Sequence, residues 1–295
     1  MKRKLAGRLV RRDQLGERTE RQMFAILDKY YANCTWEQFQ KDLSNKNRVI
    51  LLEDARSGEL KGFTTLRQFV TRTKEGREIA GLFSGDTIIE AEYWGQWALK
   101  TNFYKAMLLA WWENWLETGG RRPLFWFLIS KGYKTYLLLA NNFFEHWPRY
   151  DAILPQEQKL VIEALAEELY PGRLRAVSSQ DHLGEGLVLA FEKGSPCLRE
   201  SVAPITSKHL ENPKIRFFQN LNPGWEQGHE LCCITPISAW DLVKTISLLM
   251  SNMWLRRLGL KRRLPDAAAR PSLSPLGVTA TAREVHEVRV AEASP

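Results

Sequence analysis

The sequence contains few of the features that mark a stapled, metal-binding or membrane-spanning protein. Its 295 residues include four cysteines and five histidines. The cysteines form no Cys-x-x-Cys pair, and the histidines show no His-x-His or His-x-x-x-His spacing. No apolar run reaches the length of a bilayer span, and the basic start of the chain lacks the apolar segment of a signal peptide. We therefore expect a cytoplasmic protein without a metal site.

Three common motifs of nucleotide binding and nucleophilic catalysis are also missing. The chain has no P-loop, no Gly-x-Ser-x-Gly elbow and no Gly-x-Gly-x-x-Gly fingerprint. These absences argue against a P-loop nucleotidase, a serine hydrolase of the elbow type and a dinucleotide-dependent oxidoreductase.

Positive charge is concentrated in two acid-free segments. The net charge is +8, and residues 1–12 carry six Lys or Arg while residues 256–263 carry five. A protein that binds long nucleic acids usually carries its basic surface on the folded domain, so this distribution argues against a nucleic acid partner. Two basic flanks suit an anionic membrane surface better, which is compatible with a peripheral location on the inner face of the membrane.

The composition is that of a chain that buries a sizeable core. Hydrophobic residues make up 44% and aromatic residues 11% of the sequence. Apolar periodicity predicts helices and strands in alternation, with Gly81 and Gly85 marking a β-bulge or a close backbone approach. The expected helices are 17–31, 35–44, 101–116, 131–144 and 157–170, and the expected strands are 49–54, 62–70, 79–92, 124–130, 186–194 and 229–237.

The chain divides into five predicted parts. Residues 1–12 form a basic flank that includes a short strand, and residues 13–150 form the core. Residues 151–237 form a C-terminal elaboration that completes the sheet. An amphipathic basic helix follows over 238–264, and residues 265–295 have the Ala, Pro, Ser and Thr content of a disordered tail.

The element order before residue 150 resembles that of the GNAT acyltransferase superfamily. In that family a turn with the pattern Gln/Arg-x-x-Gly-x-Gly/Ala precedes the central helix. Here the matching segment is Glu92-Tyr93-Trp94-Gly95-Gln96-Trp97, of which Gly95 fits the pattern and Glu92 and Trp97 depart from it. The resemblance implies an α+β fold with a mixed, mainly antiparallel central sheet flanked by helices, extended by a C-terminal α/β elaboration. Size and apolarity are similar to the subset that makes N-acyl amino acids or acyl-homoserine lactones.

The same resemblance implies an acyl thioester donor. Backbone amides and a helix N-terminus would hold the pyrophosphate of an acyl-CoA, and a strand edge would receive the pantetheine arm. A phosphopantetheine-bearing acyl carrier protein is an open alternative, because it needs less from the turn and its acidic surface suits a basic flank. The implied donor-binding residues are Thr87, Ile88, Ile89, Gly95, Gln96, Trp97, Ala98 and Lys100.

Direct attack of an amine on a thioester needs a base, and three acidic residues precede the turn. Strand alternation predicts that Asp86, Glu90 and Glu92 share one face, and Glu90 is our first choice for the base.

The resemblance also implies a tyrosine on the helix after the next strand as the general acid. Tyr133 and Tyr136 are the candidates, and we select Tyr136. His146 is a third catalytic candidate, as a base or as a group that orients the acceptor, because its ordinary pKa lies near neutral pH.

The sequence thus predicts an N-acyltransferase that moves an acyl group from acyl-CoA or an acyl carrier protein to an amine. The alternative is a non-catalytic protein with the same fold that docks on a membrane or partner through its basic flanks. Glu92 and Trp97, which depart from the donor-binding turn, favour that alternative.

Overall fold

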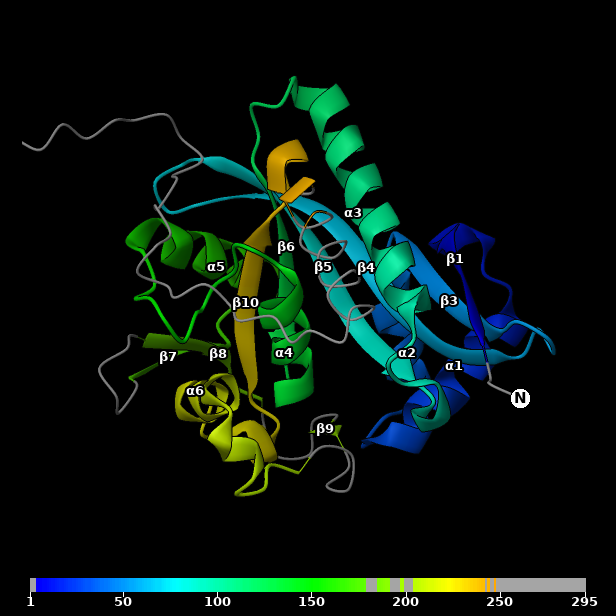
Figure 1. Cartoon of the computed structure of the whole chain (residues 1–295). Coiled ribbons are helices and arrows are strands. Elements are labelled where there is room, and N and C mark those ends of the chain that lie inside the picture. The colour runs from blue at the N-terminus through cyan, green and yellow to red at the C-terminus, as the bar shows by residue number, and fades with distance from the viewer. Residues whose placement is uncertain are drawn as a thin grey trace, which may run out of the picture. The chain divides into compact units, whose positions relative to one another are not determined.

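A sheet of eight strands runs through the protein in the order β1-β3-β4-β5-β6-β10-β8-β7 (Figure 1). Every neighbouring pair is antiparallel except β5 and β6, which are parallel. The computed structural model describes residues 4–178, 185–191, 197–198, 204–241, 243–244 and 247. The strands are β1 (Leu5–Arg11), β3 (Arg48–Asp54), β4 (Leu60–Arg72), β5 (Glu78–Ile89), β6 (Leu124–Ser130), β7 (Leu174–Ser178), β8 (Glu185–Leu189) and β10 (Glu230–Pro236), while β2 (Tyr31–Ala32) pairs with β9 (Cys197–Leu198) outside this sheet.

Helices cover both faces of the sheet because strand residues alternate between two apolar surfaces. One face packs against α3, α4 and α6, and the other packs against α1 and α2 at one end and α5 at the other. Figure 1 shows α3 and α4 on the viewer's side of the sheet. The helices are α1 (Glu17–Tyr30), α2 (Trp36–Ser44), α3 (Trp97–Thr118), α4 (Tyr133–Asn142), α5 (Gln156–Leu169) and α6 (Pro213–Leu221).

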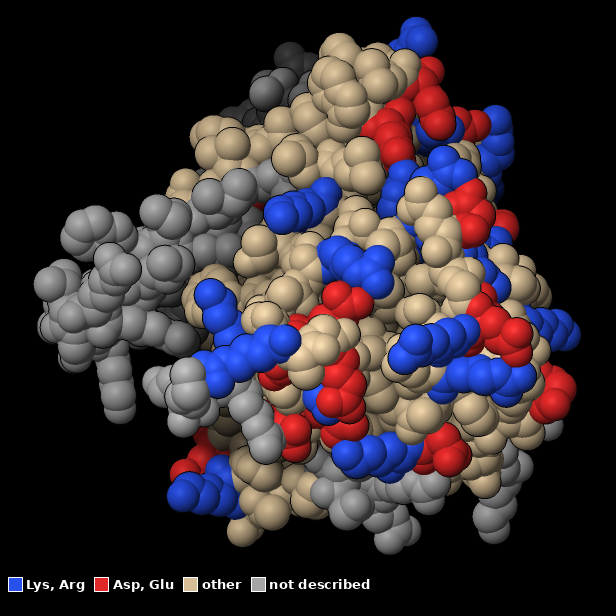
Figure 2. Space-filling model, turned by 90° about the vertical axis from the view of Figure 1, so that its right-hand side faces the viewer, with Lys and Arg blue, Asp and Glu red and all other residues tan. Residues whose placement is uncertain are grey.

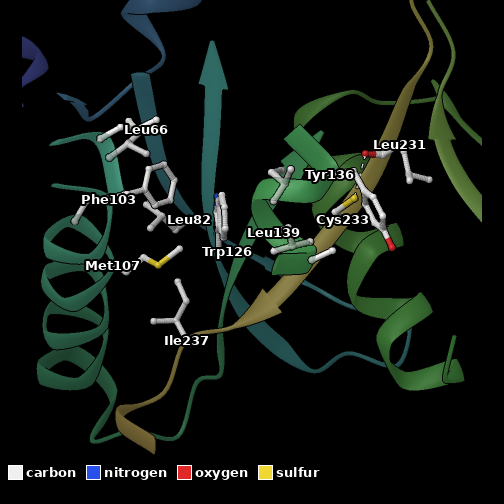
Figure 3. Close-up of a cluster of buried hydrophobic side chains, with 14 of the residues drawn as sticks. Leu66, Leu82, Phe103, Met107, Trp126, Tyr136, Leu139, Leu231, Cys233 and Ile237 are labelled. Atoms are coloured by element: carbon white, nitrogen blue, oxygen red, sulfur yellow. Dashed lines mark hydrogen bonds between the residues drawn. The ribbon is translucent and has the colours of Figure 1, made fainter. Parts of the chain in front are cut away.

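The core under α3 and α4 is built around Trp126 of β6. The centre of its ring lies 4.7 Å from the ring centre of Phe103 on α3. Its indole N–H donates to Ser84 Oγ at 2.9 Å. Figure 3 shows Trp126 between Phe103 and Met107 of α3 on one side and Leu139 of α4 on the other. This packing fixes the distance between the two helices that begin at the ends of β5 and β6.

Both predicted glycine positions have the backbone roles expected of them. A β carbon on Gly81 would lie 2.7 Å from side chains of Phe69 and Leu165, so the glycine permits close approach of α5. At Gly85 the β4–β5 register slips, because Thr64 pairs with Thr87 while Leu66 pairs with Ser84. Two residues of β5 therefore stand opposite one residue of β4, which is a β-bulge.

Most of the predicted elements are present, but some of their bounds differ, and the strands β2, β7 and β9 were not predicted. The strand predicted to reach residue 92 ends at Ile89 and is followed by a single turn of 3-10 helix over Ala91–Tyr93. Helix α3 begins at Trp97 instead of residue 101. The strand predicted over 186–194 is shorter, because β8 ends at Leu189. Helix α6 was not predicted, although Asn212 accepts from Lys214 N as its N-cap and Pro213 stands in the first turn.

The described part of the N-terminal basic segment consists mainly of the edge strand β1, and its three arginines are paired with acids. Arg8 lies 2.9 Å from Glu53, Arg12 lies 2.9 Å from Glu20, and Arg11 pairs with Asp13. Figure 2 shows basic and acidic side chains interleaved on the side of the molecule that carries β1. Within the described residues 4–12, each of the three arginines therefore lies beside an acid.

The rest of the predicted domain plan lies partly outside the described residues. That holds for most of the helix predicted over 238–264 and for all of the tail 265–295. Among the described helices, none combines the length and apolarity needed to cross a membrane.

Candidate active site

The parallel strands β5 and β6 part in the middle of the sheet. They pair from Ala80 to Ser84 on β5, opposite Leu124 to Leu128 on β6. Beyond that point β5 continues along β4, whereas β6 continues along β10. Helices α3 and α4 begin shortly after these strand ends, and neither has a side-chain N-cap. The parting strands therefore open a gap that is flanked by two helix N-termini, which attract negative charge.

A cleft reaches this gap from the face covered by α1, α2 and α5. It consists of a cavity of about 540 Å³ and an adjoining one of about 210 Å³. We call the two together the splay cleft. Both are lined by Tyr31, Asp42, Asp86, Lys131 and Tyr170.

The β-bulge places Asp86 in the splay cleft. Gly85 and Asp86 together face Thr65 across the β4–β5 pair, so the bulge turns both toward the cleft. Burial raises the pKa of Asp86, and the nearby Lys131 and Lys46 only partly oppose this. Among the described residues, none forms a hydrogen bond or ion pair with its carboxylate. Asp86 is thus a carboxylate poised to accept a proton.

Lys131 and Glu230 form the wall of the cleft beside Asp86. Their side chains are only 19% and 4% exposed, and Lys131 Nζ lies 3.2 Å from Glu230 Oε1. Burial opposes the charge on Lys131, but Glu230, Tyr31 and Asp86 outweigh it and raise its pKa. Burial raises the pKa of Glu230. Lys131 is therefore a permanent positive charge next to the candidate base.

Glu90, the predicted base, lies beyond the end of β5 and does not line the splay cleft. Its carboxylate accepts from Tyr30 Oη at 2.8 Å and pairs with Lys29 at 2.5 Å. Burial alone would raise the pKa of Glu90, but Lys29 and Tyr30 outweigh it and lower the pKa. Glu92 lies in the 3-10 turn that follows the strand. The predicted strand face that carries Asp86, Glu90 and Glu92 therefore does not extend to Glu92.

Tyr136 lies in the core instead of the splay cleft. It is fully buried, and its hydroxyl donates to Pro148 O at 3.2 Å. Figure 3 shows the Tyr136 hydroxyl pointing away from Trp126. Burial raises its pKa well above the ordinary value. Tyr133 begins α4, and its hydroxyl lies 3.4 Å from His209 Nε2.

His146 is also remote from the cleft. The backbone of the next residue, Trp147, exchanges two hydrogen bonds with the backbone of Ile234, and Ile234 lies four residues along β10 from Glu230. At a rise of about 3.3 Å per residue, this places His146 roughly 13 Å along the sheet from Glu230. Burial lowers the pKa of His146 to about 3, so its imidazole is neutral. The structure therefore does not bring Glu90, Tyr136 and His146 together.

The predicted donor-binding turn has the backbone of an open loop. Gly95 has a φ of +80°, and a β carbon there would meet nothing within 4 Å. Gln96 Oε1 accepts from Leu5 N at 2.8 Å, which ties the turn to β1. Trp97 and Ala98 follow as the first residues of α3.

Two lysines flank the turn. Lys100 Nζ donates to Asn142 Oδ1 at 3.0 Å across α3 and α4 and lies 5.2 Å from the Trp97 ring centre. Lys134 of α4 lies 4.3 Å from the ring centre of Trp94. Lys134 was not among the predicted residues, although its place four residues after a buried strand end was a usable signal. The lysines supply the positive charge that the turn itself lacks.

The strand edge predicted to receive a pantetheine arm is accessible at two of its three residues. Successive backbone N–H groups of a strand point to opposite sides. The N–H of Glu90 points toward β4, where it donates to Lys61 O. The N–H groups of Thr87 and Ile89 therefore point away from β4 and toward the gap. The carbonyl of Ile89 already accepts from the indole of Trp94 at 2.7 Å. Ile88 is buried against α1 and α2.

Within the described part of the chain, no cluster of three or more His, Cys, Asp or Glu is arranged to hold a metal ion. Cys232 and Cys233 are buried and Cys34 is half-buried, and none of these three described cysteines forms a disulfide.

Comparison with known proteins finds similarity in structure alone. No family model and no curated protein sequence matches the chain. A probable N-acyltransferase of Enterococcus faecalis V583 matches with 16% identity and a TM-score of 0.35, over 59% of this chain and 40% of that one. The YhbS GNAT-family N-acetyltransferase of Escherichia coli, in complex with CoA, matches with 9% identity and a TM-score of 0.35, over 53% of this chain and 79% of that one. A GNAT-family acetyltransferase of Staphylococcus aureus Mu50 matches with 12% identity and a TM-score of 0.33, over 51% of this chain and 90% of that one.

Similarities at this level do not assign an activity, so the fold assignment rests on topology. An antiparallel run of strands leads into one parallel pair, the pair splays, and a helix begins after each of its two strands. The chain therefore has the GNAT-like α+β fold that its element order predicts.

Proposed function

We propose that the protein is an N-acyltransferase that joins an acyl thioester to an amine at the gap between β5 and β6. One observation carries this proposal: Asp86, a carboxylate with a raised pKa, stands where the two parallel strands part. The splay cleft leads to it from one face of the sheet, and two helix N-termini lie at the same end of the sheet.

The chemistry follows from the positions of these groups. The amine enters through the splay cleft, and its nitrogen lone pair attacks the thioester carbonyl. The new C–N bond forms while the C–S bond breaks with its electrons on sulfur. Asp86 takes the proton that the amine loses and becomes neutral, while the sulfur leaves as a thiolate that takes a proton from solvent; Asp86 then returns its proton to solvent. Lys131 stabilises the ionised form of Asp86 between turnovers because it keeps a positive charge nearby.

The donor is proposed to approach from the side of α3 and α4. Phosphate groups would lie against the N-terminus of α3 at Gly95, Gln96, Trp97 and Ala98, with Lys100 and Lys134 as counter-charges. The N–H groups of Thr87 and Ile89 would bind the pantetheine amides. The groove between the two helices is filled almost completely by side chains, since its free volume is only about 20 Å³. A long acyl chain therefore requires side-chain movement there, whereas a short one does not.

The test is release of free thiol from a set of donors in the presence of pooled primary amines. The donors are acetyl-CoA, a long-chain acyl-CoA and an acyl carrier protein loaded with the same chain. We expect amine-dependent thiol release from at least one donor and a saturable rise in melting temperature with that donor. If no donor releases thiol and none shifts the melting temperature, the proposal is wrong.

A further inference from the structure

The outer face of α3 carries large apolar side chains. The inner face of the helix packs on the sheet, and Figure 3 shows Phe103 and Met107 pointing from α3 toward Trp126. On the opposite face Leu108, Trp112, Trp115 and Leu116 are 53%, 47%, 42% and 60% exposed. Their spacing places all four on one side of the helix. We call these four residues the α3 stripe.

The α3 stripe is unusual because the solvent side of a surface helix is normally polar. The rings of Trp112 and Trp115 are stacked, with 5.4 Å between their centres and 14° between their planes. They therefore present one broad apolar surface. At roughly 200 Å² for each large apolar side chain, the exposed fractions add up to an area on the order of 400 Å². A contiguous apolar patch of that size is typical of a contact surface.

The charged residues of α3 are separated along the helix. Lys100 and Lys105 lie in its N-terminal half, and Glu113 and Glu117 lie in its C-terminal half. The helix dipole favours the opposite order, with acids near the N-terminus and bases near the C-terminus. In an antiparallel pair of such helices, the basic half of each lies beside the acidic half of the other. The charge order of α3 therefore suits an antiparallel pair better than a single helix.

The two glutamates also argue against an anionic membrane as the partner of the stripe. Glu113 pairs with Arg48, and Glu117 pairs with Arg122. In both pairs the carboxylate is the more exposed partner, at 35% against 20% and at 63% against 12%. An anionic lipid surface would meet these carboxylates beside the stripe and be repelled by them.

We propose that the α3 stripe is the core of a symmetric dimer interface, in which the α3 helices of two copies of the chain pack antiparallel. A two-fold interface uses the same patch on both subunits, so it requires a patch that is complementary to itself. The stripe provides about half of the roughly 800 Å² that each partner buries in a standard interface. Lys105, Glu113 and Glu117 would contribute to the polar rim that surrounds the apolar core of such an interface.

This dimer leaves the candidate active site open. Leu108 lies eleven residues after Trp97, or roughly 16 Å along the helix from the donor-binding turn. The splay cleft opens on the other face of the sheet, which α1, α2 and α5 cover. The inference therefore does not depend on the proposed function.

The test is sedimentation velocity of the full chain over about a hundredfold range of concentration. We expect a monomer–dimer equilibrium. Leu116→Glu should raise the dissociation constant of the dimer by about tenfold or more, because it places a charge in the apolar core of the interface. The matched control is Ile153→Glu, since Ile153 is 69% exposed and lies outside α3. A wild-type chain that is monomeric throughout, or a dimer that Leu116→Glu does not weaken, would overturn the inference.

The antiparallel order has its own test. Lys105→Glu should raise the dissociation constant several-fold, because it places an acid beside the acidic half of the second helix, whereas Lys105→Arg should leave it near the wild-type value. Equal association in Lys105→Glu and the wild type would contradict the antiparallel pairing. Melting temperatures at the lowest concentration check that each variant is folded. If Leu116→Glu is not folded, Leu108→Glu takes its place with the same expected loss of dimer.

A membrane contact would give a different result. The probe is a vesicle of phosphatidylcholine with phosphatidylserine, mixed with the wild type and with Leu116→Glu. A dimer in solution without retention on the vesicles supports the inference. Retention of a monomeric wild type that Leu116→Glu abolishes would assign the stripe to lipid and overturn the inference.

Discussion

Lys131 Nζ lies 3.2 Å from Glu230 Oε1, in an ion pair that joins the end of β6 to the start of β10. Removing the cation would leave a carboxylate buried without compensation. We expect Lys131→Met to lower the free energy of unfolding by about 3 kcal/mol in urea denaturation. The double variant Lys131→Met/Glu230→Met should recover much of this loss, because it removes both charges.

A matched control exists on the surface. Arg21 pairs with Glu17 across one turn of α1, with both side chains more than half exposed. Arg21→Met should change the free energy of unfolding by no more than about 0.5 kcal/mol. If Lys131→Met costs no more than this control, Lys131 and Glu230 do not form the buried pair described above.

The raised pKa of Asp86 has a consequence for stability. A carboxyl group whose pKa is higher in the folded state binds its proton more tightly there than in the unfolded chain. Its contribution to stability is therefore present at low pH and is lost as pH rises through the folded-state pKa. Asp86→Asn should thus be more stable than the wild type at neutral pH.

The measurement is the melting temperature of both proteins as a function of pH. The difference between them should shrink as pH falls below the pKa of Asp86, where the wild-type carboxyl is already neutral. A lower melting temperature for Asp86→Asn at neutral pH would indicate that the ionised carboxylate stabilises the fold.

Gly95 is expected to matter for the donor and not only for the backbone. Its φ of +80° disfavours any L residue, and Gly58 in the β3–β4 turn has a comparable φ of +69°, with open space at both positions. Gly95→Ala and Gly58→Ala should each lose about 1 kcal/mol of stability. Only Gly95→Ala should weaken binding of the donor, by raising its Kd roughly tenfold. Equal donor affinity in the two variants, measured by calorimetric titration, would remove the turn from the donor site.

Local patterns in the sequence were sufficient to predict most of the fold. The apolar runs that became β3, β4, β6 and β10 have few alternatives to burial, and Gly85 marked the bulge correctly. Helix α6 was missed because its segment is rich in Asn, Pro and Gly. The Asn212-Pro213 pair that starts α6 is a capping signal, and it was hidden among turn residues.

The site was less predictable, because it depends on residues brought together from distant parts of the chain. Asp86 was among three candidate acids, but neither its burial nor the salt bridge of Glu90 to Lys29 is encoded locally. Lys46, on the connection between α2 and β3, gave no sign in the sequence that it faces Gly85.

The central claim is that Asp86 accepts the proton of the attacking amine. The most direct test measures kcat for Asp86→Asn, with Glu90→Gln and Tyr136→Phe as matched controls and the best donor and acceptor at saturation. We predict that Asp86→Asn lowers kcat by about 10²-fold or more while the donor Kd stays unchanged, because a general base contributes roughly 10² to 10⁴. Both controls should stay near the wild-type kcat. A normal kcat in Asp86→Asn, or a comparable loss in Glu90→Gln, would contradict the account.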